Sequence, residues 1–346
     1  MNTHRAGRIS VALAIFLVPF LFGAAIAQDY EPRVSPAASV TQTLGEATTI
    51  TVDYSRPGAK GRTIWGELIP MEKVWRTGAN EATTITVSDA VLIQGKELAA
   101  GTYGLFTIPG EDMWTVIFNG NAEQWGAYDY DESKDVLRVT VAPSEAHHAE
   151  WLTFSFRNLA GATGEMRIHW GTVAVDVPIA AANPGEKIRA SLKAGMSQTI
   201  GAGTTIEIGY SRPGVKGRTV WGELVPFGKV WRAGANENTT FSVSKDVLVE
   251  GKPLAAGTYG VYAIPEADSW TVIFSRKNDA WGSRDYSADD DALRIRVAPT
   301  QMEHAAEWMA FAADAFTLGE GNAPTATTVS LRWAGLEVPF TVAVTE

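Results

Sequence analysis

Hydrophobic and polar residues alternate over short stretches along most of the chain, which is the pattern of half-buried β-strands. Residues 49–54 and 205–210 are the clearest examples. Gly, Pro, Asn or Asp separates most of these stretches, and none has a sustained helical period. Further strands are expected at residues 83–87, 91–93, 103–108, 114–118, 137–141, 152–156, 166–170 and 173–177. We predict an all-β chain of antiparallel, jelly-roll-like sandwiches.

The chain is a duplication. Residues 54–143 align without a gap to residues 210–299, and SRPGAKGRTIWGELIPMEKVWRTGANEATT at 55–84 returns at 211–240 as SRPGVKGRTVWGELVPFGKVWRAGANENTT. A repeat this long suits two tandem domains rather than a solenoid. We expect sandwiches at 28–180 and 188–346, joined by a small-residue linker at 181–187 that is short enough to keep them close together.

The first 27 residues resemble a secretory signal. A short positive head precedes an almost wholly apolar run, and Ala25, Ile26 and Ala27 supply a cleavage pattern. The alternative is an uncleaved anchor, which the short, interrupted run disfavours. The chain has no cysteine, so disulfides and thiolate chemistry are excluded. We expect an exported protein, periplasmic or extracellular, with no membrane span after cleavage.

Charge narrows the choice of ligand. The net charge is −10, which disfavours nucleic acid, yet the repeated stretch carries an excess of basic residues. These side chains are expected to hold a small anionic or carbohydrate-like ligand, or a cell-envelope partner. The candidates are Arg56, Lys60, Arg62, Trp65, Trp75, Arg76 and Asn80, with Arg212, Lys216, Arg218, Trp221, Trp231, Arg232 and Asn236 in the second copy. The alternative is an internal network in which Arg62 and Arg76 pair with Glu67, Glu81 and Asp135.

All twelve tryptophans correspond between the copies. Trp114 and Trp170 share a face with apolar neighbours, so both are predicted to lie in the core. Trp65 and Trp151 alternate onto the polar face of their strands. With Trp75 and Trp125 they would form an aromatic platform for a sugar or a peptide side chain, unless a loop or the neighbouring domain covers them.

The usual catalytic signatures are missing, including the nucleophilic-serine elbow, the metalloprotease histidine pair and the phosphate loop. His148 with Glu150 is the best acid–base pair, but its spacing changes in the counterpart, His304 with Glu307. An acidic stretch at 129–135 lacks the glycine and glutamate of a calcium loop, while Asp135 and Arg138 suit an ion pair at a strand start. No metal, cofactor or catalytic residue is expected. An envelope hydrolase using His148 and Glu150, and a structural spacer or assembly module, remain as alternatives.

The motif run SRPGxKGRTxWGELxPxxKVWRxGANExTT, followed by GKxLAAGTYGxxxIP, WTVIF, WGxxDY and LRxxVAP, occurs in both copies. It resembles a bacterial secreted family called domain of unknown function 2911, here in tandem. The resemblance covers most of the chain beyond the signal segment. It implies exported, β-rich proteins and brings no established activity, cofactor or catalytic residue.

Overall fold

The computed structural model describes residues 31–345, so the expected signal at 1–27 lies outside the described residues. Strands make up most of this range, with three single-turn 3-10 helices between them, η1 (Glu132–Lys134), η2 (Ala288–Asp290) and η3 (Glu320–Asn322). The first repeat contains β1 (Ala37–Leu44), β2 (Thr48–Ser55), β3 (Thr84–Val87), β4 (Val91–Ile93), β5 (Lys96–Leu98), β6 (Gly101–Ile108), β7 (Trp114–Asn119), β8 (Asp135–Val141), β9 (Pro143–Ala160) and β10 (Thr163–Ala181). The second contains β11 (Leu192–Ile200), β12 (Thr204–Arg212), β13 (Thr239–Val243), β14 (Val247–Val249), β15 (Lys252–Leu254), β16 (Gly257–Pro265), β17 (Trp270–Ser275), β18 (Asp291–Val297), β19 (Thr300–Gln301), β20 (Ala310–Leu318), β21 (Pro324–Trp333) and β22 (Leu336–Val344).

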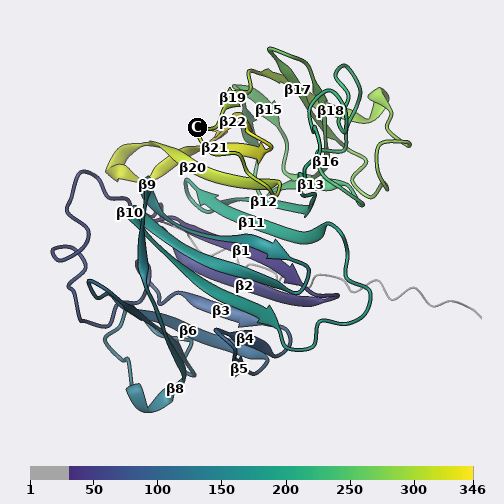
Figure 1. Ribbon diagram of the computed structural model, residues 1–346. Helices are drawn as coiled ribbons and strands as arrows, with labels where there is room; N and C mark the ends of the chain where they lie inside the picture. Colours follow the sequence, from purple (N-terminus) through teal and green to yellow (C-terminus); the bar gives the residue numbers. More distant parts are fainter. Residues whose placement is uncertain (1–30, 346) are drawn as a thin grey trace, which may run out of the picture. The chain divides into compact units, whose positions relative to one another are not determined.

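The two repeats share one twelve-stranded antiparallel sheet, in the order β18-β17-β16-β13-β12-β11-β1-β2-β3-β6-β7-β8 (Figure 1). Each repeat adds a smaller sheet, β5-β4-β10-β9 in the first and β15-β14-β22-β21-β20 in the second. The repeats are therefore fused through β1 and β11, which is closer than the side-by-side packing expected from the short linker.

The junction between β1 and β11 has internal two-fold symmetry. Val40 lies opposite Met196, and these two residues occupy equivalent positions of the duplication. Residues directly opposite each other in an antiparallel pair project from the same face of the sheet. The operation that relates the repeats therefore preserves the faces, so equivalent loops and small sheets lie on the same side of the large sheet.

Each sandwich buries its own core between its half of the large sheet and its small sheet. Ile50, Phe118 and Phe154 are among the buried residues of the first core, and Phe241, Phe274 and Phe340 are among those of the second. Alternate residues on the outer face, Phe106 and Ile117 in the first repeat, pack instead against loops. The all-β prediction is confirmed, and both faces of the large sheet are covered over part of its width.

The elements depart from the sequence prediction at several places. β1 and the short β5 are strands that the sequence analysis does not predict, and β1 has a partner, β11, in the other repeat. The strands expected at 166–170 and 173–177 form one strand, β10, whose pairing with β9 shifts at Gly171. Within residues 31–345, no helix is long and apolar enough to span a bilayer.

Candidate functional site

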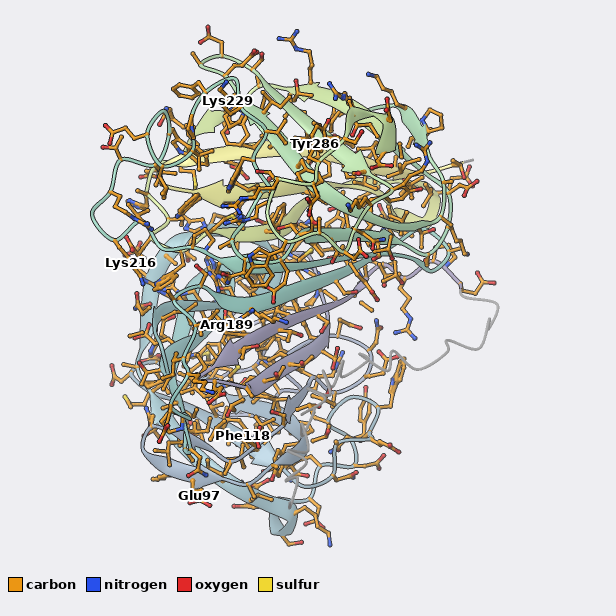
Figure 2. The ribbon with its side chains drawn as sticks, turned by 90° about the vertical axis from the view of Figure 1, so that its right-hand side faces the viewer. Glu97, Phe118, Arg189, Lys216, Lys229 and Tyr286 are labelled. Carbon is orange, nitrogen blue, oxygen red and sulfur yellow. The ribbon has the colours of Figure 1, made fainter. Side chains whose placement is uncertain are left out.

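The basic turn that opens each copy is closed by its own arginine. Nε and Nη2 of Arg62 donate to the carbonyls of Ala59 and Gly58, at 3.0 and 2.6 Å. Glu150 accepts from the backbone N–H of Lys60 at 2.7 Å. The second copy repeats all three contacts, with Arg218 closing the turn and Lys216 exposed on it (Figure 2). These two arginines are already engaged in turn structure.

The tryptophans of the motif join the core. Trp65 lies edge-on to Trp75, Trp114 and Trp170, with ring centroids 4.8–6.0 Å apart. Trp221, Trp231, Trp270 and Trp333 form the same cluster in the second repeat. The predictions for Trp114 and Trp170 are confirmed. Trp151 is buried against Phe316 of the other repeat, so the neighbouring sandwich covers it.

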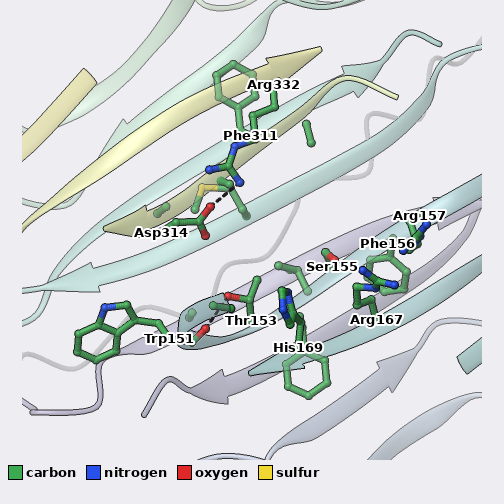
Figure 3. Close-up of a pocket in the computed structure, with 18 of the residues that line it drawn as sticks. Trp151, Thr153, Ser155, Phe156, Arg157, Arg167, His169, Phe311, Asp314 and Arg332 are labelled. Atoms are coloured by element: carbon green, nitrogen blue, oxygen red, sulfur yellow. Dashed lines mark hydrogen bonds and ion pairs between the residues drawn. The ribbon is translucent and has the colours of Figure 1, made fainter. Parts of the chain in front are cut away.

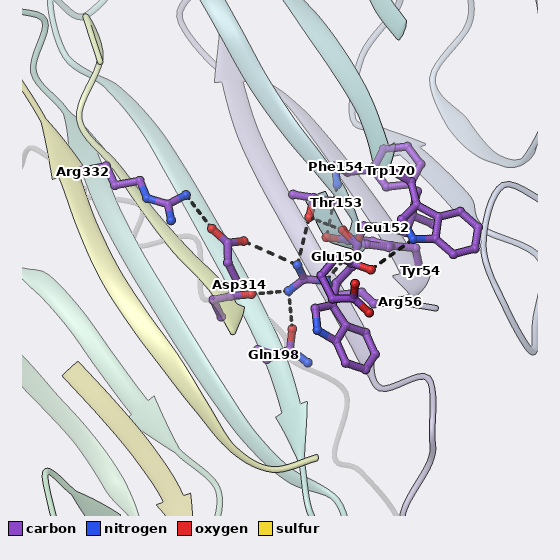
Figure 4. Close-up of polar contacts among 12 residues, drawn as sticks. Tyr54, Arg56, Glu150, Leu152, Thr153, Phe154, Trp170, Gln198, Asp314 and Arg332 are labelled. Carbon is purple, nitrogen blue, oxygen red and sulfur yellow. Dashed lines mark hydrogen bonds and ion pairs between the residues drawn. The ribbon is translucent and has the colours of Figure 1, made fainter. Parts of the chain in front are cut away.

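Arg56 joins its own sandwich to the other one (Figure 4). Its Nε donates to the Leu152 carbonyl at 2.9 Å, and its Nη1 donates to Oε1 of Gln198 at 2.8 Å and to the Ala313 carbonyl. Its Nη2 donates to Thr153 Oγ1 and lies 3.5 Å from Asp314, which also pairs with Arg332 at 2.5 Å. A buried guanidinium is thus fully engaged and neutralised.

Arg212 occupies the equivalent position with fewer partners. Its Nε donates to the Met309 carbonyl at 2.8 Å, and its Nη1 donates to Gln42 Oε1 and to the Phe156 carbonyl at 2.8 and 3.0 Å. Its Nη2 makes no hydrogen bond within residues 31–345, and no carboxylate of that range pairs with it. Arg212 is only 7% exposed, and this burial lowers its pKa.

Two substitutions between the repeats explain this difference. By the duplication, Ala310 stands where the first repeat has Thr153, and Arg157 stands where the second has Asp314. The hydroxyl and the carboxylate that serve Arg56 are therefore both replaced around Arg212. Arg157 itself turns towards Glu165 and Asp176, at 3.9 and 3.8 Å.

A cavity of about 740 Å³ lies between the two small sheets. Ala38, Val40, Ala194 and Met196 of the central strands line it, together with Arg56 and Arg212. Figure 3 shows side chains from both repeats around it, with Thr153, His169 and Arg167 across from Phe311, Asp314 and Arg332. Its size fits a small organic molecule, and its walls mix apolar and charged groups.

Histidines line the same cavity at one side. Nε2 of His169 donates to the His147 carbonyl at 2.8 Å, and burial lowers the pKa of His169, which favours its neutral form. His148 lies 3.4 Å from Glu150, whereas its counterpart His304 lies 4.0 Å from Glu303 instead. The two copies share a different contact of this glutamate. Glu150 accepts a hydrogen bond from the backbone N–H of Lys60, and Glu307 accepts one from the backbone N–H of Lys216. The described residues contain no cluster of three His, Asp or Glu side chains suited to a metal ion.

The remaining candidates lie elsewhere. Asn80 donates to the Ser35 carbonyl at 3.2 Å, which fastens the segment before β1, and Asn236 makes the equivalent contact with Ser191. The side chains of Arg76 and Arg232 lie on the outer face of the large sheet. The expected partners of the internal network differ as well, since Glu81 pairs with Arg33 and Asp135 pairs with Arg138 at a strand start. Of the fourteen candidates, the cavity brings together only Arg56 and Arg212.

Sequence reasoning missed Gln42 and Gln198, which join the two arginines across the repeats. Both are fully buried polar residues at equivalent places in the duplication. Buried polar side chains usually have hydrogen-bond partners, so a repeated Gln-Thr within an alternating stretch was the available signal.

Comparison with known proteins agrees with this architecture. Residues 35–179 and 191–342 each match a family described as protein of unknown function (DUF2911). No curated protein and no solved structure matches the chain. The two matched ranges each contain one sandwich and together cover most of the chain, which confirms the resemblance seen in the motifs. The chain therefore belongs to this family of unknown function, as a tandem copy of it.

Proposed function

We propose that the protein is a non-catalytic binding protein for a small organic anion, held in the cavity between the repeats. The observation that supports this proposal most directly is Arg212, a buried guanidinium that lines the cavity and has no carboxylate partner among the described residues. Burying an uncompensated charge is costly, and a bound anion would remove that cost. The free Nη2 supplies a donor for one oxygen of the ligand.

The cavity walls define the rest of the ligand. Val40, Met196, Phe156 and Phe311 offer apolar surface, so a carboxylate with an apolar body fits better than a fully polar ion. We further propose that this binding takes place after export, since the first 27 residues have the pattern of a secretory signal. A carbohydrate-like ligand or an envelope partner at the turns themselves is less well supported, because Arg62 and Arg218 are held by their own turn carbonyls.

The test is calorimetric titration of the protein with phenylacetate, with neutral phenylacetamide as the matched ligand. We expect phenylacetate to bind and the amide not to bind. Arg212→Gln should abolish binding, and Arg218→Gln, which removes the same charge from an exposed turn of the same repeat, should leave it intact. Equal binding by the Arg212→Gln and unmodified proteins would refute the proposal.

An envelope hydrolase is the second candidate, because His148 and Glu150 lie 3.4 Å apart and line the same cavity. The second repeat lacks this pair, which favours binding over catalysis. Turnover of 4-nitrophenyl acetate that disappears in His148→Ala would support the hydrolase. If neither binding nor turnover is found, the continuous sheet supports a spacer role instead.

A further inference from the structure

Each repeat displays one exposed indole on the outer face of the large sheet. Trp125 is 57% exposed and Trp281 is 61% exposed, while the other ten tryptophans are buried or half-buried. Both lie in equivalent loops, between β7 and β8 in the first repeat and between β17 and β18 in the second. A solvent-exposed tryptophan at equivalent positions of both repeats is unusual, because this side chain is usually largely buried.

The loop holds this indole in place. The Ala82 N–H donates to the Gln124 carbonyl at 3.0 Å, and the Gly126 N–H donates to the Asn80 carbonyl at 3.1 Å, on either side of Trp125. The second repeat repeats both bonds around Trp281. Beneath the first loop, Ala127 and Tyr130 pack on the outer-face cluster of Phe106 and Ile117. The indole is therefore presented by fixed backbone.

An arginine lies against the loop that carries each exposed indole. Arg76 Nη1 would lie 3.8 Å from a Cβ added at Gly126, and Arg232 Nη1 would lie 2.6 Å from one added at Gly282. Each guanidinium thus lies close to the glycine that follows the exposed tryptophan, at a positive φ of +72° or +79°. In the first repeat the Tyr128 ring lies closer still, 3.0 Å from the Cβ added at Gly126. Neither side chain makes a hydrogen bond or an ion pair with any residue in the described range, and the Nε of each is shielded from solvent.

The charge around these loops selects against an anionic ligand. Two of the carboxylates near these loops are already paired, Glu81 with Arg33 and Glu237 with Arg189. Asp129 and Asp285 are exposed, and neither pairs with a basic side chain within residues 31–345. An exposed ring face, with guanidinium donors and carboxylate acceptors on or against the same loop, matches the surface of a neutral sugar ring, which has C–H faces and hydroxyl groups at its rim.

From this repeated arrangement we propose that the protein has two glycan-binding sites, Trp125 with Arg76 and Trp281 with Arg232, each taking a neutral sugar ring. Because the operation that relates the repeats preserves the faces of the sheet, both sites lie on the same face. Seven strand spacings of about 4.8 Å separate β6 from β16 along the sheet, and the twist of the sheet turns its two ends relative to each other. A flexible polysaccharide chain that follows the sheet can reach both sites, and linked binding raises the apparent affinity over that of either site.

The test is affinity electrophoresis of the protein in gels that contain dextran, galactomannan or hydroxyethylcellulose, with polygalacturonate as the acidic polymer. We expect retardation by at least one neutral polymer and none by polygalacturonate. Trp125→Ala or Trp281→Ala alone should weaken retardation about tenfold or more, and the double variant should abolish it. Phe227→Ala, which removes another exposed aromatic side chain, should have no effect.

Arg76→Gln with Arg232→Gln tests the donor role separately and should weaken retardation with the indoles in place. Arg212→Gln should leave retardation unchanged, so this inference and the anion proposal fail or succeed independently. Thermal unfolding of each variant shows whether it is folded. No retardation by any neutral polymer, retardation by polygalacturonate alone, or full retardation of the folded double tryptophan variant would each overturn the proposal.

Discussion

Arg56 and Arg212 are the same residue of a duplicated sequence, placed by the same fold in two different electrostatic environments. Each reaches across the central strands to a glutamine of the other repeat. Arg56 has a hydroxyl and a carboxylate beside it, whereas Arg212 has neither within the described residues. The shared contacts explain how the repeats are joined. The difference identifies which of the two arginines is available to a ligand.

The largest expected effect comes from removing Arg56. Arg56→Met removes one of the two arginines that pair with Asp314 and leaves several buried acceptors without their donor, so it should lower the free energy of unfolding by roughly 3–5 kcal/mol. Arg212→Met also leaves three acceptors without their donor, but it removes a buried charge that has no counterion, so its loss of stability should be clearly smaller than that of Arg56→Met. Urea unfolding in chloride-only buffer measures both. Equal losses of stability in the two variants would contradict the proposed difference between the surroundings of Arg56 and those of Arg212.

Asp314→Asn removes one of the two groups that distinguish the surroundings of Arg56 from those of Arg212. We expect a loss of about 1–3 kcal/mol at pH 7, because Arg56 and Arg332 lose a charged partner. When Thr153→Ala is added, which removes the other group, phenylacetate should bind at two sites instead of one, and the stoichiometry of titration reports this. Asp268→Asn, at an exposed position, is the matched control and should change neither quantity.

The same carboxylate predicts a pH dependence. Burial alone would raise the pKa of Asp314, but Arg332 and Arg56 outweigh it and hold the pKa below its ordinary value. The stability from this group is therefore present above the unfolded pKa of about 3.9, and it is lost as the pH falls through the lower folded value. The stability difference between Asp314→Asn and the unmodified protein should shrink over that acid range, and a constant difference would rule this out.

A reciprocal change should give Arg212 the partners that Arg56 has and so prevent it from binding a ligand. Arg157→Asp combined with Ala310→Thr gives Arg212 the two groups that serve Arg56, so phenylacetate binding should be lost while stability rises or holds. Arg157→Gln is the control, since it removes the same positive charge without adding a carboxylate, and it should weaken binding only modestly. Undiminished binding in the double variant would show that Arg212 does not receive the anion.

The smallest expected effect concerns His169, which stands in the first repeat where the second has Arg332. Burial lowers the pKa of His169, so the neutral form is favoured in the folded protein. Stability is fully present above the unfolded pKa of about 6.5 and declines as the pH falls through the lower folded pKa. His169→Gln should flatten this decline between pH 7 and pH 5, while His304→Gln, which is exposed, should not.

The sequence was sufficient for the fold class and the duplication because alternation and turn residues are local signals. It placed Trp114 and Trp170 in the core on the same basis. It did not predict the fused sheet, because β1 finds its partner β11 more than a hundred residues away and no local pattern records that pairing. The cavity follows from the same long-range junction.

For the site, proximity in sequence was a poor guide to proximity in space. Arg56 and Arg62 lie six positions apart, yet the first points into the cavity and the second folds back on its turn. The decisive partners of Arg56 come from the other repeat. The contrast between Asp314 and Arg157 was visible in the sequence only as a departure between the less similar ends of the two copies.

The most direct measurement is a crystal structure of the protein grown with 4-bromophenylacetate, with the bromine located by its anomalous scattering. The account predicts one bromine in the cavity between the repeats, with the ligand carboxylate within about 3 Å of Arg212 Nη2. An empty cavity at saturating ligand, or a carboxylate bound at Arg56 or at the exposed turns instead, would contradict it.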